Sequence, residues 1–283
     1  MRVQILTKND CYKRGVPIEP KGIMMHSTGA NNPTLKRYVG PDDGILGENI
    51  YGNHWNNPGL DVCVHAFIGE TKDGTVECYQ TLPWKMRSWH CGAEANGTHI
   101  SIEICEDNRN HAEYFRATRD KALDVVSDLC MEFDFDPLAK GVLIDHSEGA
   151  AMGIASNHGD VTHWWSRFNY SMDEFRQDVS RRMKEKEEAM KEELKKLVQQ
   201  EVAEAMKDIV IPEPDVSGAA EEAVDGLMST WGTKDTHSDY STQAIDWALE
   251  NKLVSGRESG NYGWKKPITR EEFITILYRV LNP

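Results

Sequence analysis

The sequence contains 283 residues, of which 39% are hydrophobic, and its formal net charge is −14. This charge disfavours nucleic acid as a partner, because phosphate binding needs a basic surface. The sequence has no run of 18 or more apolar residues, so we expect no membrane span. The length suits one medium domain followed by a small one.

The first half of the chain alternates short apolar runs with turn residues. Residues 21–28 are typical of a buried strand, and 62–69 and 75–82 of two strands joined by a turn at Lys72-Asp73-Gly74. Residues 118–135 place apolar side chains at helical spacing. Strands and helices therefore alternate, which predicts an α/β fold.

Residues 99–105 (HISIEIC) alternate in the manner of a strand, with three isoleucines on one face and Glu103 on the other. A carboxylate in such apolar surroundings is costly unless it is used or paired. Glu103 is therefore a candidate catalytic group, and the alternative is a partner in a buried salt bridge.

The cysteines do not form a C-x-x-C pair, which argues against a cysteine zinc site. A disulfide framework usually belongs to a shorter secreted chain. We therefore expect the cysteines to be mostly reduced and buried as small apolar residues. They are Cys11, Cys63, Cys78, Cys91, Cys105 and Cys130.

The second half of the chain changes character. Residues 181–209 contain no Gly, Pro or aromatic residue, and predict one long helix whose apolar stripe suits a coiled coil; a solvated single-helix linker is the alternative. Residues 211–226 have the composition of a linker, and amphipathic helices are expected at 244–256 and 270–281. The stripe comprises Met190, Leu194, Leu197, Val202 and Ile209.

Three polar positions suggest a metal site. Hydrolysis of an amide needs an activated water, a base and a group that holds the oxyanion, and a zinc ion with three protein ligands supplies much of this. His26 and His146 each end an apolar run, so their side chains can meet at one edge of a sheet. The segment Asn157-His158-Gly159-Asp160 offers a third ligand.

A series of motifs resembles the type 2 zinc amidase family, which includes phage endolysins, cytoplasmic anhydromuropeptide amidases and animal peptidoglycan recognition proteins. The resemblance covers residues 21–165, about half of the chain, and implies a mixed central sheet flanked by helices around a zinc site. In chain order the motifs are MMHST (24–28), VHAFIG with KDGTV (64–76), SWHCG (88–92), NGTHISIEI (96–104), IDHSEG (144–149) and ASNHGDVTHWW (155–165).

The resemblance implies roles for individual residues. His26, His146 and Asp160 would bind Zn²⁺. Glu103 would be the general base, and His158 would stabilise the tetrahedral oxyanion.

The resemblance also implies a substrate-binding cleft beside these residues. His90 and Asn96 would contact the substrate, and His65 would lie behind the ligands or in the wall of the cleft.

The segment between the last two ligands departs from the cytoplasmic members of the family. Residues 148–153 lengthen the spacing between His146 and Asp160, which leaves His158 or His163 as rival ligands. We prefer Asp160, because His158 is then free for the oxyanion. We expect His163 to be a stacking or capping residue beside the two tryptophans that follow it.

The C-terminal residues, about 230–281, resemble a single S-layer homology motif through AIDWALENKLVSG and ITREEFITILYRVL. Such modules usually occur as sets of three and bind secondary polymers of Gram-positive cell walls. We therefore expect a catalytic domain at 1–180, a long helix and linker at 181–226, and a wall-binding or oligomerisation domain at 227–283.

Together the resemblances imply an N-acetylmuramoyl-L-alanine amidase that cuts peptidoglycan between N-acetylmuramic acid and L-alanine and lyses the cell wall. A recognition protein that binds without hydrolysis and a structural wall-anchored protein are the alternatives. The presence of both Asp160 and Glu103 favours the enzyme.

Two further expectations concern location and assembly. The N-terminus lacks the apolar region of a signal peptide, so we expect synthesis in a bacterial cytoplasm and action on the wall after release. The long helix and the single S-layer-like motif predict an oligomer, most simply a trimer. The rival is a monomer in which the helix is only a spacer.

Overall fold

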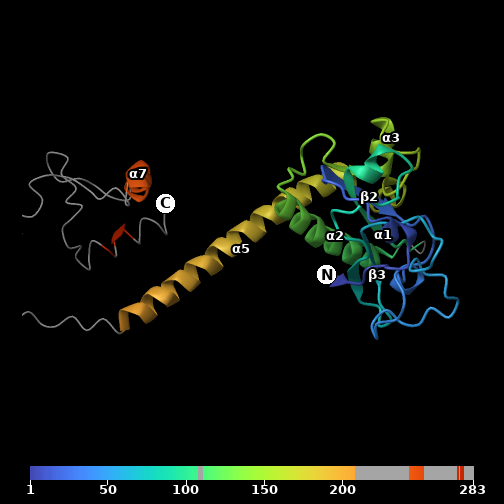
Figure 1. Ribbon diagram of the computed structural model, residues 1–283, viewed down its shortest axis with the longest axis horizontal. Coiled ribbons are helices and arrows are strands. Elements are labelled where there is room, and N and C mark those ends of the chain that lie inside the picture. Colours follow the sequence, from blue (N-terminus) through green and yellow to red (C-terminus); the bar gives the residue numbers. More distant parts are fainter. Residues whose placement is uncertain (108–110, 208–241, 252–272, 274, 277–283) are drawn as a thin grey trace, which may run out of the picture. The chain divides into compact units, whose positions relative to one another are not determined.

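The computed structural model describes residues 1–107, 111–207, 242–251, 273 and 275–276 (Figure 1). The chain divides into two compact units, Met1–Met190 and Lys191–Pro283. The expected linker at 211–226 and most of the expected helix at 270–281 lie outside the described residues. The domain boundaries expected at 180 and 226 stay predictions.

The first unit is built on one mixed sheet in the order β1-β4-β3-β5-β2-β6. Neighbouring strands are parallel except β3 and β4, which form the antiparallel pair predicted from the sequence. Gly74 in their connecting turn has φ +83°, a conformation that favours glycine. The strands are β1 (Arg2–Val3), β2 (Gly22–Ser27), β3 (Ala66–Glu70), β4 (Val76–Gln80), β5 (His99–Ile104) and β6 (Leu143–Asp145).

Helices surround this sheet, so the predicted α/β class with a mixed central sheet is confirmed. The helix predicted at 118–135 extends over Ala112–Phe133, because apolar side chains at helical spacing already begin at Tyr114. The helices are α1 (Asp10–Arg14), α2 (Ala112–Phe133), α3 (His146–Ala151), α4 (Thr162–Trp165), α5 (Met172–Lys207) and α7 (Thr242–Glu250), with 3-10 turns η1 (Leu35–Arg37), η2 (Glu94–Gly97) and η3 (Ser166–Phe168).

Both faces of the sheet are covered by apolar side chains. The three isoleucines of β5 belong to the cluster that contains Val126 and Leu129 of α2, as their alternation predicts. Phe67 and Tyr79 belong to a second cluster, with Leu35 of η1. The central strands are therefore buried on both faces, and their carboxyl ends open onto the site.

Helix α5 begins at Met172, well before the expected start at 181. Its first turns bury Phe175 and Val179 in the main core, and Lys186 donates to Asp128 of α2 at 2.6 Å. Figure 1 shows α2 and these turns side by side. The sequence prediction was based on a charged segment, 181–209, that contains no aromatic residue, so it left out the turns around Phe175. These turns and the charged segment belong to one helix.

Two cysteines differ from the expected reduced state. Cys11 and Cys63, 52 positions apart, form a disulfide between α1 and the segment before β3. The side-chain amide of Asn9 donates to the carbonyl of Val62 at 3.0 Å and thereby holds these two segments together. Nothing in the cysteine spacing predicted this pair. The expectation of free, buried cysteines is met by Cys78, Cys91, Cys105 and Cys130.

None of the helices in the described part of the chain is both long and apolar enough to cross a membrane. Helix α7, Thr242–Glu250, overlaps the amphipathic helix expected at 244–256 and begins two residues before it.

Candidate active site

The site forms where three parallel strands end. His26 on β2 is in register with Glu103 on β5. On its other side β2 pairs with β6, which ends at Asp145 and is followed directly by His146. Because the three strands are parallel, their carboxyl ends reach the same edge of the sheet, where α/β proteins bind ligands. This is the arrangement predicted for His26 and His146.

His146 is the first residue of α3 and is fixed by a capping box. The Asp145 side chain accepts from the N–H of Glu148 at 2.7 Å, and the Glu148 side chain accepts from the N–H of Asp145 at 3.1 Å. Arg176 of α5 donates to both oxygens of Glu148 at 2.9 Å. The N–H of His146 donates to the Asp160 carbonyl at 3.1 Å, which ties the third predicted ligand to the same point.

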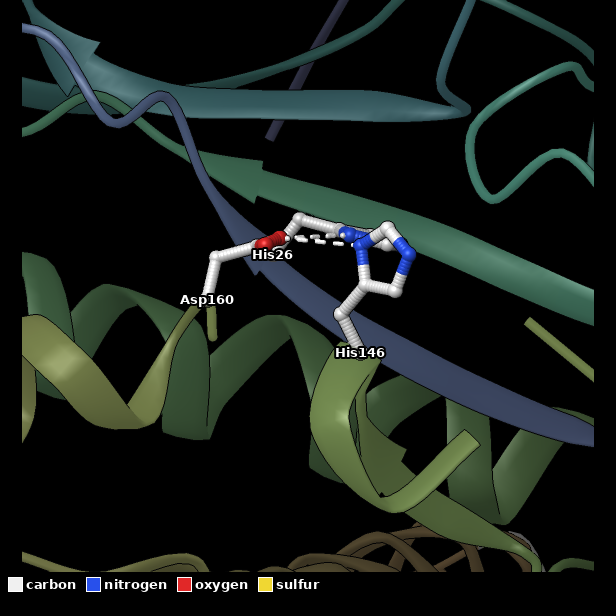
Figure 2. Close-up of side chains that lie close together, drawn as sticks. All are labelled: His26, His146 and Asp160. Carbon is white, nitrogen blue, oxygen red and sulfur yellow. Dashed lines mark hydrogen bonds and ion pairs between the residues drawn. The ribbon is translucent and has the colours of Figure 1, made fainter. Parts of the chain in front are cut away.

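The three predicted ligands converge (Figure 2). Oδ2 of Asp160 lies 2.9 Å from Nδ1 of His26 and 3.3 Å from Nδ1 of His146. The candidate ligand atoms all lie within 4.8 Å of one another. Two imidazoles and one carboxylate are a donor set typical of catalytic zinc. The rival ligands His158 and His163 do not join a metal-binding group within the described residues.

The protonation states of this cluster also fit a metal. Burial lowers the pKa of His26, although Asp160 opposes the shift. Burial raises the pKa of Asp160, but the neighbouring imidazoles of His146 and His26 outweigh this effect and hold the pKa well below its usual range. An ionised carboxylate and a neutral imidazole are the forms that bind metal. The residues present therefore fit a zinc ion.

A pocket of about 530 Å³ opens above the cluster. Five of its lining residues are histidines, which is half of the histidines in the chain. Its lining residues are His26, Ser27, Thr28, Gly29, His90, Glu103, His146, His158, Gly159, Asp160 and His163.

Glu103 lies in this pocket and is not a salt-bridge partner within the described residues. Burial raises its pKa well above the usual range, and the carboxylates of Asp160 and Glu106 raise it further. A carboxyl group with a raised pKa beside a metal-binding cluster has the properties of a general acid or base.

His158 is exposed and lines the pocket next to the cluster. Its ring centroid lies 4.7 Å from that of His146, in an edge-on arrangement. It can therefore direct a ring N–H toward a group bound in the pocket while His26, His146 and Asp160 hold the metal.

The three predicted substrate-binding residues occupy different places. His90 lines the pocket. Asn96 is fully buried and is not among the residues that line the pocket; its Oδ1 accepts from the N–H groups of His90 and Cys91 at 2.8 and 3.0 Å. Its place in a tight 3-10 turn directs the amide inward. The expected contact of Asn96 with substrate stays a prediction.

His65 is also fully buried. Its Nδ1 accepts from the N–H of Ser101 at 2.9 Å, and its Nε2 lies 2.8 Å from the carbonyl oxygen of Met86. Ser101 stands on the Glu103 face of β5, two positions from Glu103. His65 therefore packs beneath the site and does not line the pocket. Of the two expected positions, behind the ligands or in the wall of the cleft, this agrees with the first.

Glu106 is a site residue that the sequence did not reveal. It is 1% exposed, and its Oε1 accepts from the Ser27 hydroxyl at 2.7 Å and the Gly29 N–H at 2.9 Å. His163 pairs with the same oxygen at 2.9 Å, and its Nδ1 lies 3.1 Å from the carbonyl oxygen of Gly159 just before α4. Of the stacking or capping role expected for His163, these contacts resemble capping. The rule that pointed to His26 and His146, a polar residue just after a buried strand, also applies to Glu106.

Comparisons with known proteins agree with this geometry. The family model described as N-acetylmuramoyl-L-alanine amidase matches residues 16–162, and the S-layer homology domain model matches residues 233–274. No curated protein matches the sequence.

Several solved structures are similar to the chain. The Staphylococcus aureus hydrolase AmiA in complex with its ligand has 22% identity and a TM-score of 0.47, over 61% of this chain and 76% of that one. PlyL has 19% identity and a TM-score of 0.43, over 63% and 96%. The N-acetylmuramoyl-L-alanine amidase LysC from Clostridium intestinale URNW has 17% identity and a TM-score of 0.30, over 54% and 88%.

The family match covers more than half of the chain and includes the strand ends that carry His26, Glu103, His146 and Asp160. The chain therefore belongs to the N-acetylmuramoyl-L-alanine amidase family and carries an S-layer homology domain toward its C-terminus.

Proposed function

We propose that this peptidoglycan amidase uses zinc to hydrolyse the bond between N-acetylmuramic acid and L-alanine. The observation that carries the proposal is that His26, His146 and Asp160 converge in a pocket that also contains the carboxyl group of Glu103. When bound, zinc supplies Lewis acidity, which activates water and polarises the scissile carbonyl.

The chain's own residues then move the proton and hold the charge. Glu103 accepts a proton from the attacking water and passes it to the leaving amine of L-alanine. Its raised pKa suits this exchange, because a carboxylate with a raised pKa takes up a proton from water more readily than an ordinary one. His158 directs a ring N–H toward the oxyanion that forms on the carbonyl oxygen.

Binding without hydrolysis is the competing function. By the family resemblance, recognition proteins of this fold typically lack the third metal ligand. Asp160 lies beside both histidines here, and Glu103 shares their pocket, which supports hydrolysis.

The experiment that tests the proposal is digestion of purified peptidoglycan with mass analysis of the new ends. We expect free L-alanine amino termini without new reducing sugars. These termini should not form with chelated protein, and they should form again after zinc is added. New reducing ends would identify a glycosidase and contradict the proposal.

We further propose that the chain acts as a wall-lysing oligomer, with a trimer as the simplest form. Along α5, Met190, Leu194 and Leu197 are 59%, 60% and 52% exposed, at the alternating spacing of four and three residues that characterises a coiled-coil seam. Three chains joined in this way would bring three S-layer homology domains together, which raises avidity for a cell-wall polymer without new contacts.

A further inference from the structure

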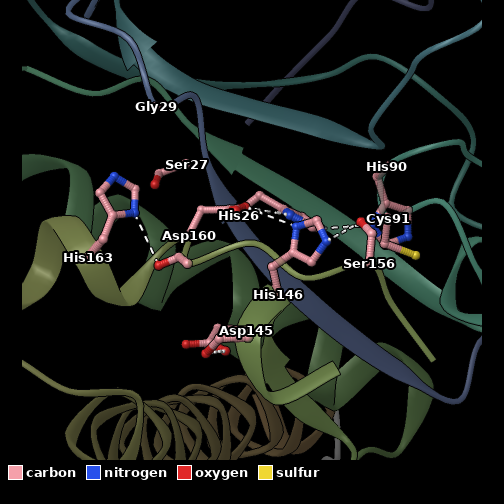
Figure 3. Close-up of polar contacts among 12 residues, drawn as sticks. His26, Ser27, Gly29, His90, Cys91, Asp145, His146, Ser156, Asp160 and His163 are labelled. Atoms are coloured by element: carbon pink, nitrogen blue, oxygen red, sulfur yellow. Dashed lines mark hydrogen bonds and ion pairs between the residues drawn. The ribbon is translucent and has the colours of Figure 1, made fainter. Parts of the chain in front are cut away.

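Both candidate zinc-binding histidines have their far ring nitrogens occupied (Figure 3). Nε2 of His26 lies 2.7 Å from Nδ1 of His90. Nε2 of His146 lies 3.1 Å from the hydroxyl oxygen of Ser156. Each histidine therefore presents Nδ1 to Asp160 and Nε2 to a fixed partner.

The direction of the first contact follows from its far end. Nε2 of His90 lies 3.3 Å from the carbonyl oxygen of Ala95, which can only accept a hydrogen bond. In a neutral ring the proton of His90 is then on Nε2, and its Nδ1 is an acceptor. Nε2 of His26 must donate to it, which leaves the lone pair of His26 Nδ1 facing Asp160.

This direction brings acceptors together at the cluster. The lone pair of His26 Nδ1 and the carboxylate of Asp160 lie 2.9 Å apart, and Nδ1 of His146 lies 3.3 Å from the same oxygen. Such an arrangement is favourable when a cation lies between the groups. The hydrogen-bond chain that ends at Ala95 therefore sets His26 in the tautomer that a metal needs.

The partners of the two ligand histidines, His90 and Ser156, are both held by the segment 90–96. Oδ1 of Asn96 accepts from the N–H groups of His90 and Cys91, and the carbonyl of Cys91 accepts from the N–H of Ser156 at 2.8 Å. Ala95, whose carbonyl ends the chain, is the neighbour of Asn96 in η2. Asn96 thus connects to both ligand histidines without touching either.

We propose that the segment 90–96 positions both zinc ligands, with His90 and Ser156 as the residues in contact and the buried Asn96 as the residue that couples them. The inference rests on the proposed zinc-dependent function. It assigns His90 to orienting His26 and Asn96 to the metal site rather than to the substrate.

The first test is the zinc dissociation constant of the full chain, measured by competition with a chromophoric chelator. Loss of a hydrogen-bond partner of a ligand histidine typically weakens metal binding by about 10–100-fold. We expect this for His90→Phe, which keeps a ring but has no acceptor. In His90→Asn the side-chain oxygen can replace Nδ1 as the acceptor. The zinc dissociation constant of this variant should therefore remain within about threefold of the wild-type value.

Asn96→Ala should weaken zinc binding over the same range, although Asn96 touches neither ligand. Asn56→Ala is the matched control, because Asn56 is also a buried asparagine whose Oδ1 accepts a backbone N–H, that of Lys8, at 2.8 Å. Asn56 does not line the pocket. Asn56→Ala should therefore lower the melting temperature and leave the zinc affinity unchanged.

A second readout needs no variant. Long-range ¹⁵N–¹H NMR of the zinc-loaded wild-type protein should show His90 protonated at Nε2 alone. Protonation at Nδ1 would overturn the directed chain.

The outcomes separate the two levels of the argument. Failure of the wild-type protein to bind zinc would overturn the proposed function. Tight zinc binding that is equal in wild type, His90→Phe and Asn96→Ala would leave that function standing and overturn the positioning role. Equal loss of affinity in Asn56→Ala, or no rescue by His90→Asn, would also overturn it.

Discussion

His163 and Glu106 form a pair of 2.9 Å that joins the start of α4 to the segment directly after β5. Nε2 of His163 faces the Glu106 carboxylate, and its Nδ1 lies 3.1 Å from the carbonyl oxygen of Gly159. Both partners of the ring are therefore hydrogen-bond acceptors. The Glu106 carboxylate also accepts from the Ser27 hydroxyl. The pair therefore holds the loop that carries Asp160 against the strand that carries His26.

Glu106→Ala should lower the free energy of unfolding by about 1–3 kcal/mol, because it leaves the buried hydroxyl group of Ser27 without its acceptor. Urea denaturation of the metal-free protein measures the change. Glu19→Ala is the control, since Glu19 forms an exposed pair with Lys85 at 3.9 Å and should change stability by less than about 1 kcal/mol. Equal effects of the two substitutions would show that the Glu106 pair adds nothing to stability.

Glu103→Gln should reduce the rate of peptidoglycan cleavage by about two to four orders of magnitude, the usual contribution of a general base. Zinc content should stay at the wild-type level, because Glu103 is not among the three converging ligands. The fold should also persist, since burial already favours the neutral form of this carboxyl group. Activity within tenfold of wild type would rule out Glu103 as the base.

Asp160→Ala and His158→Ala should separate metal binding from catalysis. Asp160→Ala should lose zinc, because it removes the oxygen on which both histidines converge. His158→Ala should keep zinc and lose about 10²–10³-fold in kcat, as removal of an oxyanion donor does. Metal analysis together with cleavage rates tests both. Zinc retained by the first variant and lost by the second would exchange the two assignments.

His65 should make stability depend on pH. Burial lowers its pKa from 6.5 to about 4, although the hydrogen bond to the Met86 carbonyl opposes this. The folded protein keeps His65 neutral, so between pH 6.5 and 4 the unfolded chain binds a proton that the folded chain does not. Stability is therefore fully present above pH 6.5 and falls as the pH drops through this window.

The loss from His65 should amount to about 3 kcal/mol, at about 1.4 kcal/mol per pKa unit. His65→Gln removes the titrating ring, so its unfolding free energy should decline less between pH 6.5 and 4. Denaturation series at several pH values test this. Parallel pH profiles for the two proteins would show that His65 does not contribute.

The exposed stripe on α5 should set the oligomeric state. Leu194→Glu with Leu197→Glu places charges in the proposed seam and should convert the oligomer to a monomer in light scattering at micromolar concentration. Glu188→Lys with Glu192→Lys changes charge on the opposite side of the same helix and should leave the mass unchanged. A monomeric mass for the wild-type chain would end the trimer proposal.

The sequence alone determined the class of the fold and the main features of the site. Strict alternation over 99–105 placed the isoleucines in the core and Glu103 on the other face, because successive side chains of a strand point to opposite sides. Apolar runs that end in His26 and His146 predicted their meeting, because parallel strands end at one edge of a sheet. Local periodicity carries this information, and no tertiary contact is needed to read it.

Only the tertiary structure decided which polar residues support the ligands. Glu106, Asn96 and Ser156 carry no periodic signal. Glu106 accepts from the N–H of Gly29, and the N–H of Ser156 donates to the carbonyl of Cys91, in both cases across a long stretch of sequence. Asn96 accepts from the N–H of Cys91 in the same turn, which only the folded backbone places within reach. The disulfide between Cys11 and Cys63 depends in the same way on contacts across 52 positions. Side-chain patterns report which face is buried, whereas the direction of a hydrogen bond depends on where the folded backbone places its donors and acceptors.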